Sequence, residues 1–128
     1  MLLKPANIRA CWPFVREGIE KTKALRGGSY RPEDVYAACV NREAFLYLCD
    51  EGFVILKPIM DEYSLERILL VWLVWGEGDA DLIEKYQGEI VDIARGEAFD
   101  KLQFYRHAKG PVEYRDWVKT YSIYEMEV

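Results

Sequence analysis

The sequence predicts an α+β fold, and three observations carry this prediction. The uncharged run from Ile68 to Trp75 is rich in β-branched and aromatic residues and stops at Gly76, which indicates a buried central strand. The stretch after it repeats its apolar residues at helical spacing, as do two stretches near the N-terminus. Two shorter apolar runs flank an Asp-Glu-Gly turn at residues 50–52, a pattern typical of an antiparallel hairpin.

Length and composition narrow the class of protein. The 128 residues are most simply one domain spanning residues 1–128, and a 51% hydrophobic content is enough for one core. The net charge is −5 and the 17 basic residues are scattered among 22 acidic ones, which argues against nucleic-acid binding. No apolar run has the length of a membrane helix and no signal segment is present, so we expect a cytoplasmic protein.

The cysteines do not form a recognisable motif. Cys11, Cys39 and Cys49 are widely spaced, no CxxC pair occurs, and His107 is the only histidine. We therefore expect free, mostly buried thiols in a reducing compartment, with no metal site.

The N-terminal third predicts a short edge strand within residues 2–8 and two helices. The first helix is expected from Cys11, with Pro13 in its first turn, and stops at Gly27-Gly28. The second is expected to begin at Pro32, because acidic residues follow at once in the first turn, and to end before Asn41.

The hairpin leads into the central strand and a third helix. Pro58 is expected to end or bend the second hairpin strand, and Asp61 to Ser64 to form the next turn. Asp79 is the expected N-cap of the third helix, and Gly96 its left-handed C-terminal cap. The remaining expected elements are a strand at 99–106, a break at 107–111, a short helix at 112–119 and a strand at 121–128.

This order of elements resembles the GCN5-related N-acetyltransferase (GNAT) superfamily, including small phage-encoded members. In that family two helices precede a three-stranded antiparallel meander, whose last strand leads into a helix that carries the coenzyme A pyrophosphate. The resemblance spans nearly the whole chain and implies a mixed, mostly antiparallel sheet flanked by helices, with acetyl-CoA as cofactor.

The family motif after the fourth strand reads Gln or Arg, two residues, Gly, any residue, then Gly or Ala. The matching stretch is Trp75-Gly76-Glu77-Gly78-Asp79-Ala80, which keeps the small residues and lacks the leading Gln or Arg. The resemblance implies that the backbone of Val74 and Trp75 faces the pantetheine. It implies that the pyrophosphate meets the amides of Gly76, Gly78, Asp79 and Ala80.

The charges of this turn oppose that role. Glu77, Asp79 and Asp81 place up to three carboxylates beside a dianionic ligand. Each costs about 1 kcal/mol at 4 Å in water and about 4 kcal/mol at an effective dielectric constant near 20. Helix-terminus attraction contributes only about 0.3 to 2 kcal/mol, so repulsion wins unless the carboxylates point away.

Acetyl transfer to an amine needs a base for the ammonium and an acid for the leaving thiolate. The resemblance implies Glu66 as the base and Tyr114 as the acid, with Tyr121 as an equal competitor. His107 is a further candidate, because the ordinary pKa of an imidazole is near neutrality. The alternatives without a catalytic role are a solvated strand-end charge for Glu66 and a packing role for Tyr114.

Other sites at the same turn have less support. The GEGDAD stretch partly matches a dinucleotide-binding fingerprint, but it follows a hairpin past the midpoint of the chain, where a Rossmann fold does not place it. The glycines can also simply end a strand. The four tryptophans can line a pocket or belong to the core.

Two functions remain open from the sequence. The first is an acyl-CoA-dependent N-acetyltransferase whose amine or protein substrate is unknown. The second is a catalytically inactive protein of the same fold that serves as a phage structural or interaction protein, with a phage or self-association partner. The glycine spacing favours the first, and the acidic turn favours the second.

Overall fold

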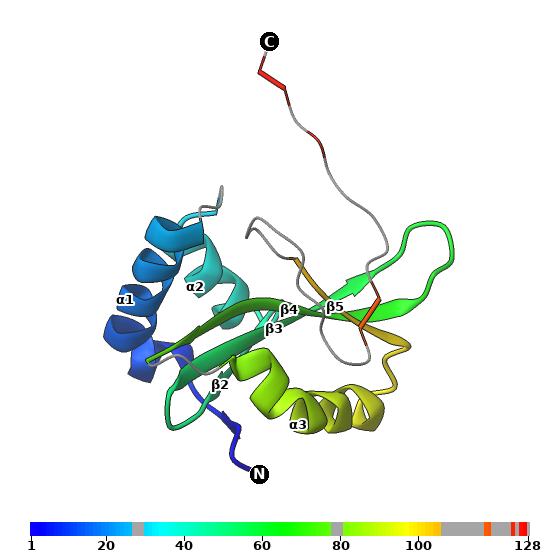
Figure 1. Cartoon of the computed structure of the whole chain (residues 1–128), viewed down its shortest axis with the longest axis horizontal. Coiled ribbons are helices and arrows are strands. Elements are labelled where there is room, and N and C mark those ends of the chain that lie inside the picture. Colours follow the sequence, from blue (N-terminus) through cyan, green and yellow to red (C-terminus); the bar gives the residue numbers. More distant parts are fainter. Residues whose placement is uncertain (27–29, 78–80, 106–116, 119–123, 125, 128) are drawn as a thin grey trace.

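The computed structural model describes residues 1–26, 30–77, 81–105, 117–118, 124 and 126–127 (Figure 1). These residues form three helices and five strands. In chain order they are β1 (Lys4–Pro5), α1 (Ile8–Arg26), α2 (Pro32–Val40), β2 (Phe45–Leu48), β3 (Gly52–Met60), β4 (Arg67–Gly76), α3 (Leu82–Gly96) and β5 (Lys101–Phe104).

The five strands form one sheet in the order β1-β2-β3-β4-β5. Neighbours from β1 to β4 are antiparallel, whereas β5 runs parallel to β4. The parallel step follows from the chain path, because α3 crosses over one face between the two strands. The predicted mixed, mostly antiparallel α+β fold is confirmed.

Helices cover both faces of the sheet (Figure 1). One face packs on α1 and α2, and we call this layer the α1–α2 core; its buried residues include Val15, Ile19, Val35, Phe53, Ile55 and Leu73. The other face packs on α3, and we call it the α3 core; it includes Leu3, Val54, Leu56, Leu69, Val71, Tyr86 and Ile90. The residues of β3 alternate between the two cores at Phe53, Val54 and Ile55, as period-two strand geometry requires.

The first helix begins earlier than its sequence signals indicate. α1 starts at Ile8, after Asn7, whose Oδ1 accepts a hydrogen bond from the Arg9 N–H at 2.9 Å. Pro13 is therefore inside the helix and not in its first turn, so the prediction of a start at Cys11 is wrong. The second helix begins at Pro32 and ends at Val40 as predicted.

Both ends of α3 differ from the predicted caps. The N-cap is Asp81, whose carboxylate accepts hydrogen bonds from the amides of Ile83 and Glu84; Asp79 lies outside the described residues. At the other end, Gly96 is the last helical residue and the left-handed position belongs to Ala98, with φ 59°. The predicted cap at Gly96 is thus wrong by two residues.

The hairpin and the following turn form where they were predicted, but β3 does not stop at Pro58. β2 pairs only with Phe53 to Leu56, so beyond that point β3 has no neighbour on this side among the described strands. A proline lacks an N–H and is tolerated at such an edge, which lets β3 continue to Met60. Near the N-terminus, β1 is a two-residue strand whose Pro5 pairs with Tyr47.

The C-terminal part of the chain is described at only a few positions. β5 falls within the predicted strand at 99–106. The indole N–H of Trp117 donates to the side-chain oxygen of Gln87 at 2.8 Å, and its ring meets Phe104 edge-on. The expected break at 107–111 and most of the expected short helix and last strand lie outside the described residues.

Among the described residues, no helix combines the length and the apolar character that crossing a membrane requires.

Candidate functional site

The central strand contains a β-bulge. Leu56 of β3 pairs with Val71 of β4, and the neighbouring Ile55 pairs with Leu73, so Trp72 has no partner on β3. The extra residue turns Trp72 and Leu73 toward the same side, and both pack on the α1–α2 core. β4 therefore changes direction and face just before it reaches the loop at 77–81.

The other edge of β4 loses its neighbour at the same point. β5 pairs with β4 from Ile68 to Val71. From Trp72 to Gly76, the described part of the chain supplies no strand on this side of β4. The main-chain groups along such an edge can bind an extended ligand as an added strand would be bound.

The tryptophan side chains do not lie along this edge. Trp75 packs against α1 and β3, with its ring 5.5 Å from Phe14 and 5.9 Å from Phe53 between centroids. Trp72 meets Tyr30 at 6.1 Å, and the Lys57 ammonium lies 4.6 Å from its ring centroid. Both indoles thus belong to the α1–α2 face of the sheet.

The turn between β2 and β3 contacts both ends of the loop at 77–81. The carbonyl of Glu51 accepts the N–H of Glu77 at 2.8 Å, just after β4 ends. Its carboxylate accepts from the Lys85 ammonium at 2.6 Å and from the Tyr86 hydroxyl at 2.7 Å, in the first turns of α3. We call Glu51, Glu77, Lys85 and Tyr86 the Glu51 clamp.

Close approach of the turn to β4 depends on a glycine. A Cβ atom at Gly52 would lie 1.9 Å from the carbonyl oxygen of Trp75, so no other residue fits there without moving the strand. Gly52 pairs directly with Gly76, the last residue of β4. The clamp is therefore built on two facing glycines.

The ionisation of the clamp follows from its hydrogen bonds. The Lys85 ammonium and the Tyr86 hydroxyl hold the pKa of Glu51 below its ordinary value. In return, the carboxylate raises the pKa of Lys85 and of Tyr86. At neutral pH the clamp is a carboxylate joined to an ammonium and a neutral phenol, so the Lys85 ammonium near the start of α3 is already paired.

The start of α3 is also partly occupied. Asp81 Oδ1 accepts the N–H groups of Ile83 at 3.0 Å and Glu84 at 3.3 Å, which are the amides that would otherwise face an anion. The strand edge fits a pantetheine arm, because the described residues supply no strand to its main-chain groups. The helix terminus fits a pyrophosphate less well, because a carboxylate already caps it.

The described structure does not bring the predicted acid–base residues to the loop end of β4. Glu66 precedes β4 at its opposite end, roughly 30 Å from Gly76 for a strand that rises about 3.3 Å per residue. There its carboxylate accepts from Lys101 Nζ at 2.9 Å and from Ser64 Oγ at 3.2 Å. Tyr114, with its competitors Tyr121 and His107, lies outside the described residues. Their roles stay predictions.

The cofactor-binding residues are described only in part. Val74, Trp75 and Gly76 form the end of β4, whereas Gly78, Asp79 and Ala80 lie outside the described residues.

Sequence reasoning missed Glu51, because the Asp-Glu-Gly stretch indicates a turn and nothing in it indicates a partner 34 residues away. Within the described residues, no cluster of His, Cys, Asp and Glu is placed to hold a metal, and the three cysteines are free and partly buried.

Comparisons with known proteins agree with this architecture at the level of the fold. One solved structure, described as a probable acetyltransferase, superposes with a TM-score of 0.67 at 16% identity and covers 99% of this chain and 100% of its own. The chain has an acetyltransferase fold. A ribosomal-protein-alanine N-acetyltransferase from Brucella melitensis biovar Abortus 2308 matches with a TM-score of 0.61 at 15% identity, covering 94% of this chain and 97% of its own.

A third match has a known ligand in its description. An aminoglycoside acetyltransferase from an uncultured soil metagenomic sample, in complex with trehalose, matches with a TM-score of 0.55 at 9% identity over 92% of this chain and 95% of its own. No protein-family model matches the sequence, and no curated protein matches it. The likeness is therefore one of fold, at sequence identities of 9% to 16%.

Proposed function

We propose that the chain is an acyl-CoA-dependent N-acetyltransferase acting on an amine. One observation carries the proposal: the edge of β4 from Trp72 to Gly76 lacks a strand partner in the described residues and leads directly into the loop before α3. An extended ligand can bind this edge through main-chain hydrogen bonds and place a charged end at the loop. The acetyltransferase fold of the chain supports this arrangement.

In this proposal the backbone of Val74 and Trp75 holds the pantetheine of acetyl-CoA. The amides of Gly76, Gly78, Asp79 and Ala80 face its pyrophosphate. When bound, the cofactor supplies an acyl group activated as a thioester. The chain supplies orientation. Glu66 and Tyr114 stay the sequence-based candidates for base and acid, although Glu66 lies at the opposite end of β4 from the loop.

A thermal-shift titration with acetyl-CoA tests the proposal. A ligand that binds only the folded state adds about 2.7 kcal/mol of stability at 100 times its dissociation constant, which raises the melting temperature by several degrees. ATP at the same concentrations is the control, because it carries a polyphosphate without a pantetheine arm. We expect a shift with acetyl-CoA that ATP does not reproduce; no shift at millimolar acetyl-CoA would overturn the proposal.

A second function has one specific observation in its favour. Asp81 caps α3 with its own carboxylate, as a helix terminus without an anionic ligand would be capped. The alternative is therefore a catalytically inactive protein of this fold that acts through a protein partner, such as a phage structural component. Absence of both the acetyl-CoA shift and thiol release from acetyl-CoA with mixed amines would favour it.

A further inference from the structure

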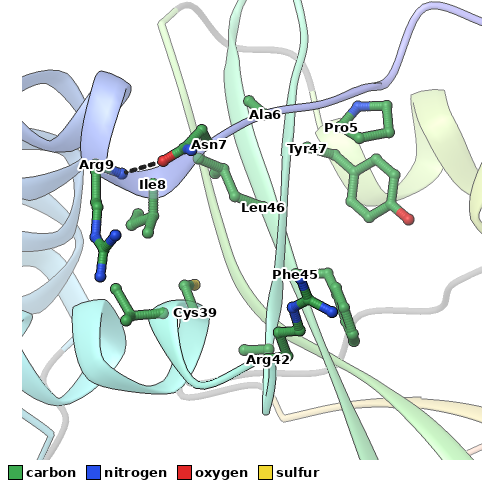
Figure 2. A pocket seen from close by; sticks show the side chains of 12 residues that line it. Pro5, Ala6, Asn7, Ile8, Arg9, Cys39, Arg42, Phe45, Leu46 and Tyr47 are labelled. Atoms are coloured by element: carbon green, nitrogen blue, oxygen red, sulfur yellow. Dashed lines mark hydrogen bonds between the residues drawn. The ribbon is translucent and has the colours of Figure 1, made fainter.

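A pocket of ≈350 Å³ lies at the opposite edge of the sheet from β5. It is bounded by the segment from Pro5 to Arg9, the end of α2 and the outer edge of β2 (Figure 2). β3 separates β2 from β4, so this pocket is distinct from the candidate cofactor site. Its volume is at the lower end of the range typical of small-molecule sites.

Part of the wall is apolar and neutral. Ile8, Ala44 and Leu46 line this part, and each is at most 5% exposed in total. Cys39 also lines the wall, and burial raises the pKa of its thiol to about 11, so it carries no charge at neutral pH. This part can contact the apolar body of a small ligand, beside polar surface that makes up more of the lining.

The polar part of the lining is basic. Arg9 and Arg42 both line the pocket, and no acidic side chain does. Figure 2 shows Arg9 entering from the first turn of α1 and Arg42 from the turn after α2. Within the described residues, neither guanidinium forms an ion pair or donates a side-chain hydrogen bond. Arg95 has no such partner in the described residues either, so what distinguishes Arg9 and Arg42 is their place in one pocket without an acidic side chain.

Three other arginines of the described residues are engaged. Arg16 pairs with Glu20, Arg31 pairs with Asp34, and Arg67 donates to the carbonyls of Glu97 and Ala98. The two arginines of the pocket are therefore not explained by the ion pairs that hold the fold together. A planar guanidinium with free donors matches a carboxylate or a phosphate.

The backbone of Arg42 is an independent observation. Arg42 has φ 60°, a left-handed conformation that favours glycine. It is the residue after the C-cap of α2, where its N–H donates to the carbonyl of Cys39 and the next N–H, of Glu43, donates to Ala38. A glycine at this position would adopt the left-handed conformation without strain. An arginine here lowers stability and places a guanidinium at the pocket, and strain of this kind often marks a functional position.

We propose that this pocket binds a small organic anion, a carboxylate or a phosphate monoester with an apolar body, between the guanidinium groups of Arg9 and Arg42. The apolar wall takes the body of the ligand, and the two arginines take its charged end. The last carbonyls of α2 that face this turn are already hydrogen-bonded to Arg42 and Glu43, so they do not present free acceptors to the anion. The proposal does not depend on acetyl-CoA binding.

The test uses two anionic probes and a neutral one. Phenyl phosphate, benzoate and benzyl alcohol are titrated separately while amide resonances of the full chain are followed by NMR. We expect saturable shifts at Ile8, Arg42 and Leu46 with at least one anion and none with benzyl alcohol. The stronger of the two anions identifies the preferred charged group. No saturable shift at tens of millimolar probe, or equal shifts with benzyl alcohol, would overturn the proposal.

Variants of Arg42 separate binding from stability. Arg42→Gly relieves the left-handed strain, so its melting temperature should equal or exceed that of the wild type, whereas its affinity for the anion should fall by about tenfold or more. Arg42→Lys keeps the charge and the strain, and should retain part of the affinity. Arg9→Gln should weaken binding like Arg42→Gly.

Arg95→Gln is the matched control, because Arg95 is an exposed arginine in the last turn of α3, outside the pocket. It should leave the affinity unchanged. Unchanged affinity in Arg42→Gly, or an equal loss in Arg95→Gln, would contradict the proposal. Arg42→Gly should leave any acetyl-CoA shift intact, so failure of the anion site and failure of the acetyltransferase proposal are distinguishable.

Discussion

At the scale of single residues, Asp81 has two opposed effects. As the N-cap of α3 it satisfies two backbone amides, and such a cap contributes about 0.5–2 kcal/mol to stability. The same carboxylate repels an anion at the helix terminus by about 1 kcal/mol at 4 Å in water. One side chain therefore stabilises the helix that would carry the cofactor and weakens the binding of its pyrophosphate.

Asp81→Asn separates these effects, because asparagine caps a helix about as well as aspartate does but carries no charge. We expect the free energy of unfolding to change by less than about 1 kcal/mol. The dissociation constant of acetyl-CoA, measured by calorimetry, should fall by about fivefold, which corresponds to the lost repulsion of about 1 kcal/mol.

Asp92→Asn is the control for that measurement, since Asp92 is exposed and lies in α3 more than two turns from the N-cap. It should leave the dissociation constant unchanged. An equal effect of both variants would mean that net charge, and not the position of Asp81, governs binding.

At the scale of elements, α1 is held close to the sheet at Gly18. A Cβ atom there would lie 2.5 Å from Phe53 Cε1 and 2.9 Å from the ring of Trp75. Both rings belong to the α1–α2 face, and Trp75 is in the part of β4 beyond the bulge. The placement of α1 and the course of the β4 edge are therefore coupled through Gly18, which has no side chain.

Gly18→Ala should reduce the free energy of unfolding by about 1–3 kcal/mol, because the added methyl group displaces two packed rings. Gly88→Ala is the matched control: Gly88 is inside α3, and a Cβ atom added there would have nothing within 4 Å, so this variant should gain up to about 1 kcal/mol from helix propensity. Urea denaturation measures both. Equal stabilities for the two variants would show that α1 and β4 are not in close contact at this point.

At the scale of the whole molecule, the Glu51 clamp connects segments that are far apart in the chain. It joins the β2–β3 turn to the end of β4 and to the start of α3, and so links both sides of the loop at 77–81. Because Tyr86 is almost fully buried in the α3 core, the clamp also ties this loop to the packing of the helix. Loss of the clamp should therefore be felt as a loss of global stability.

The lowered pKa of Glu51 gives a pH dependence with a definite sign. A carboxyl group whose pKa is lower in the folded state contributes stability above its unfolded pKa, about 4.3, and this contribution is lost as the pH falls through the folded value. Between about pH 5 and 2, we expect the free energy of unfolding to decline less in Glu51→Gln than in the wild type. The difference between the two declines should equal the contribution of this one carboxyl group. Glu62→Gln, at an exposed turn position, should follow the wild-type profile; if Glu51→Gln does so as well, the clamp has no ionic role in solution.

The sequence predicts most elements of this fold because the deciding signals are local. Pro32 and the acids after it place the start of α2, and the uncharged run before Gly76 places β4. The errors occur where two residues compete for one role, as Asp79 with Asp81 at a cap and Gly96 with Ala98 at a helix end. The Glu51 clamp is unpredictable for another reason, because its partners meet only when the sheet and α3 are assembled.

The bulge at Trp72 also accounts for the difference in length between β3 and β4. β4 has ten residues and β3 has nine, yet both begin and end in register, at Arg67 with Met60 and at Gly76 with Gly52. Trp72 is thus a surplus residue that the ladder does not need. Without it, the alternation of faces would be regular on both flanks, so the sheet accommodates Trp72 without a change of topology. We therefore expect deletion of Trp72 to remove the bend from the candidate site and to keep the strand order.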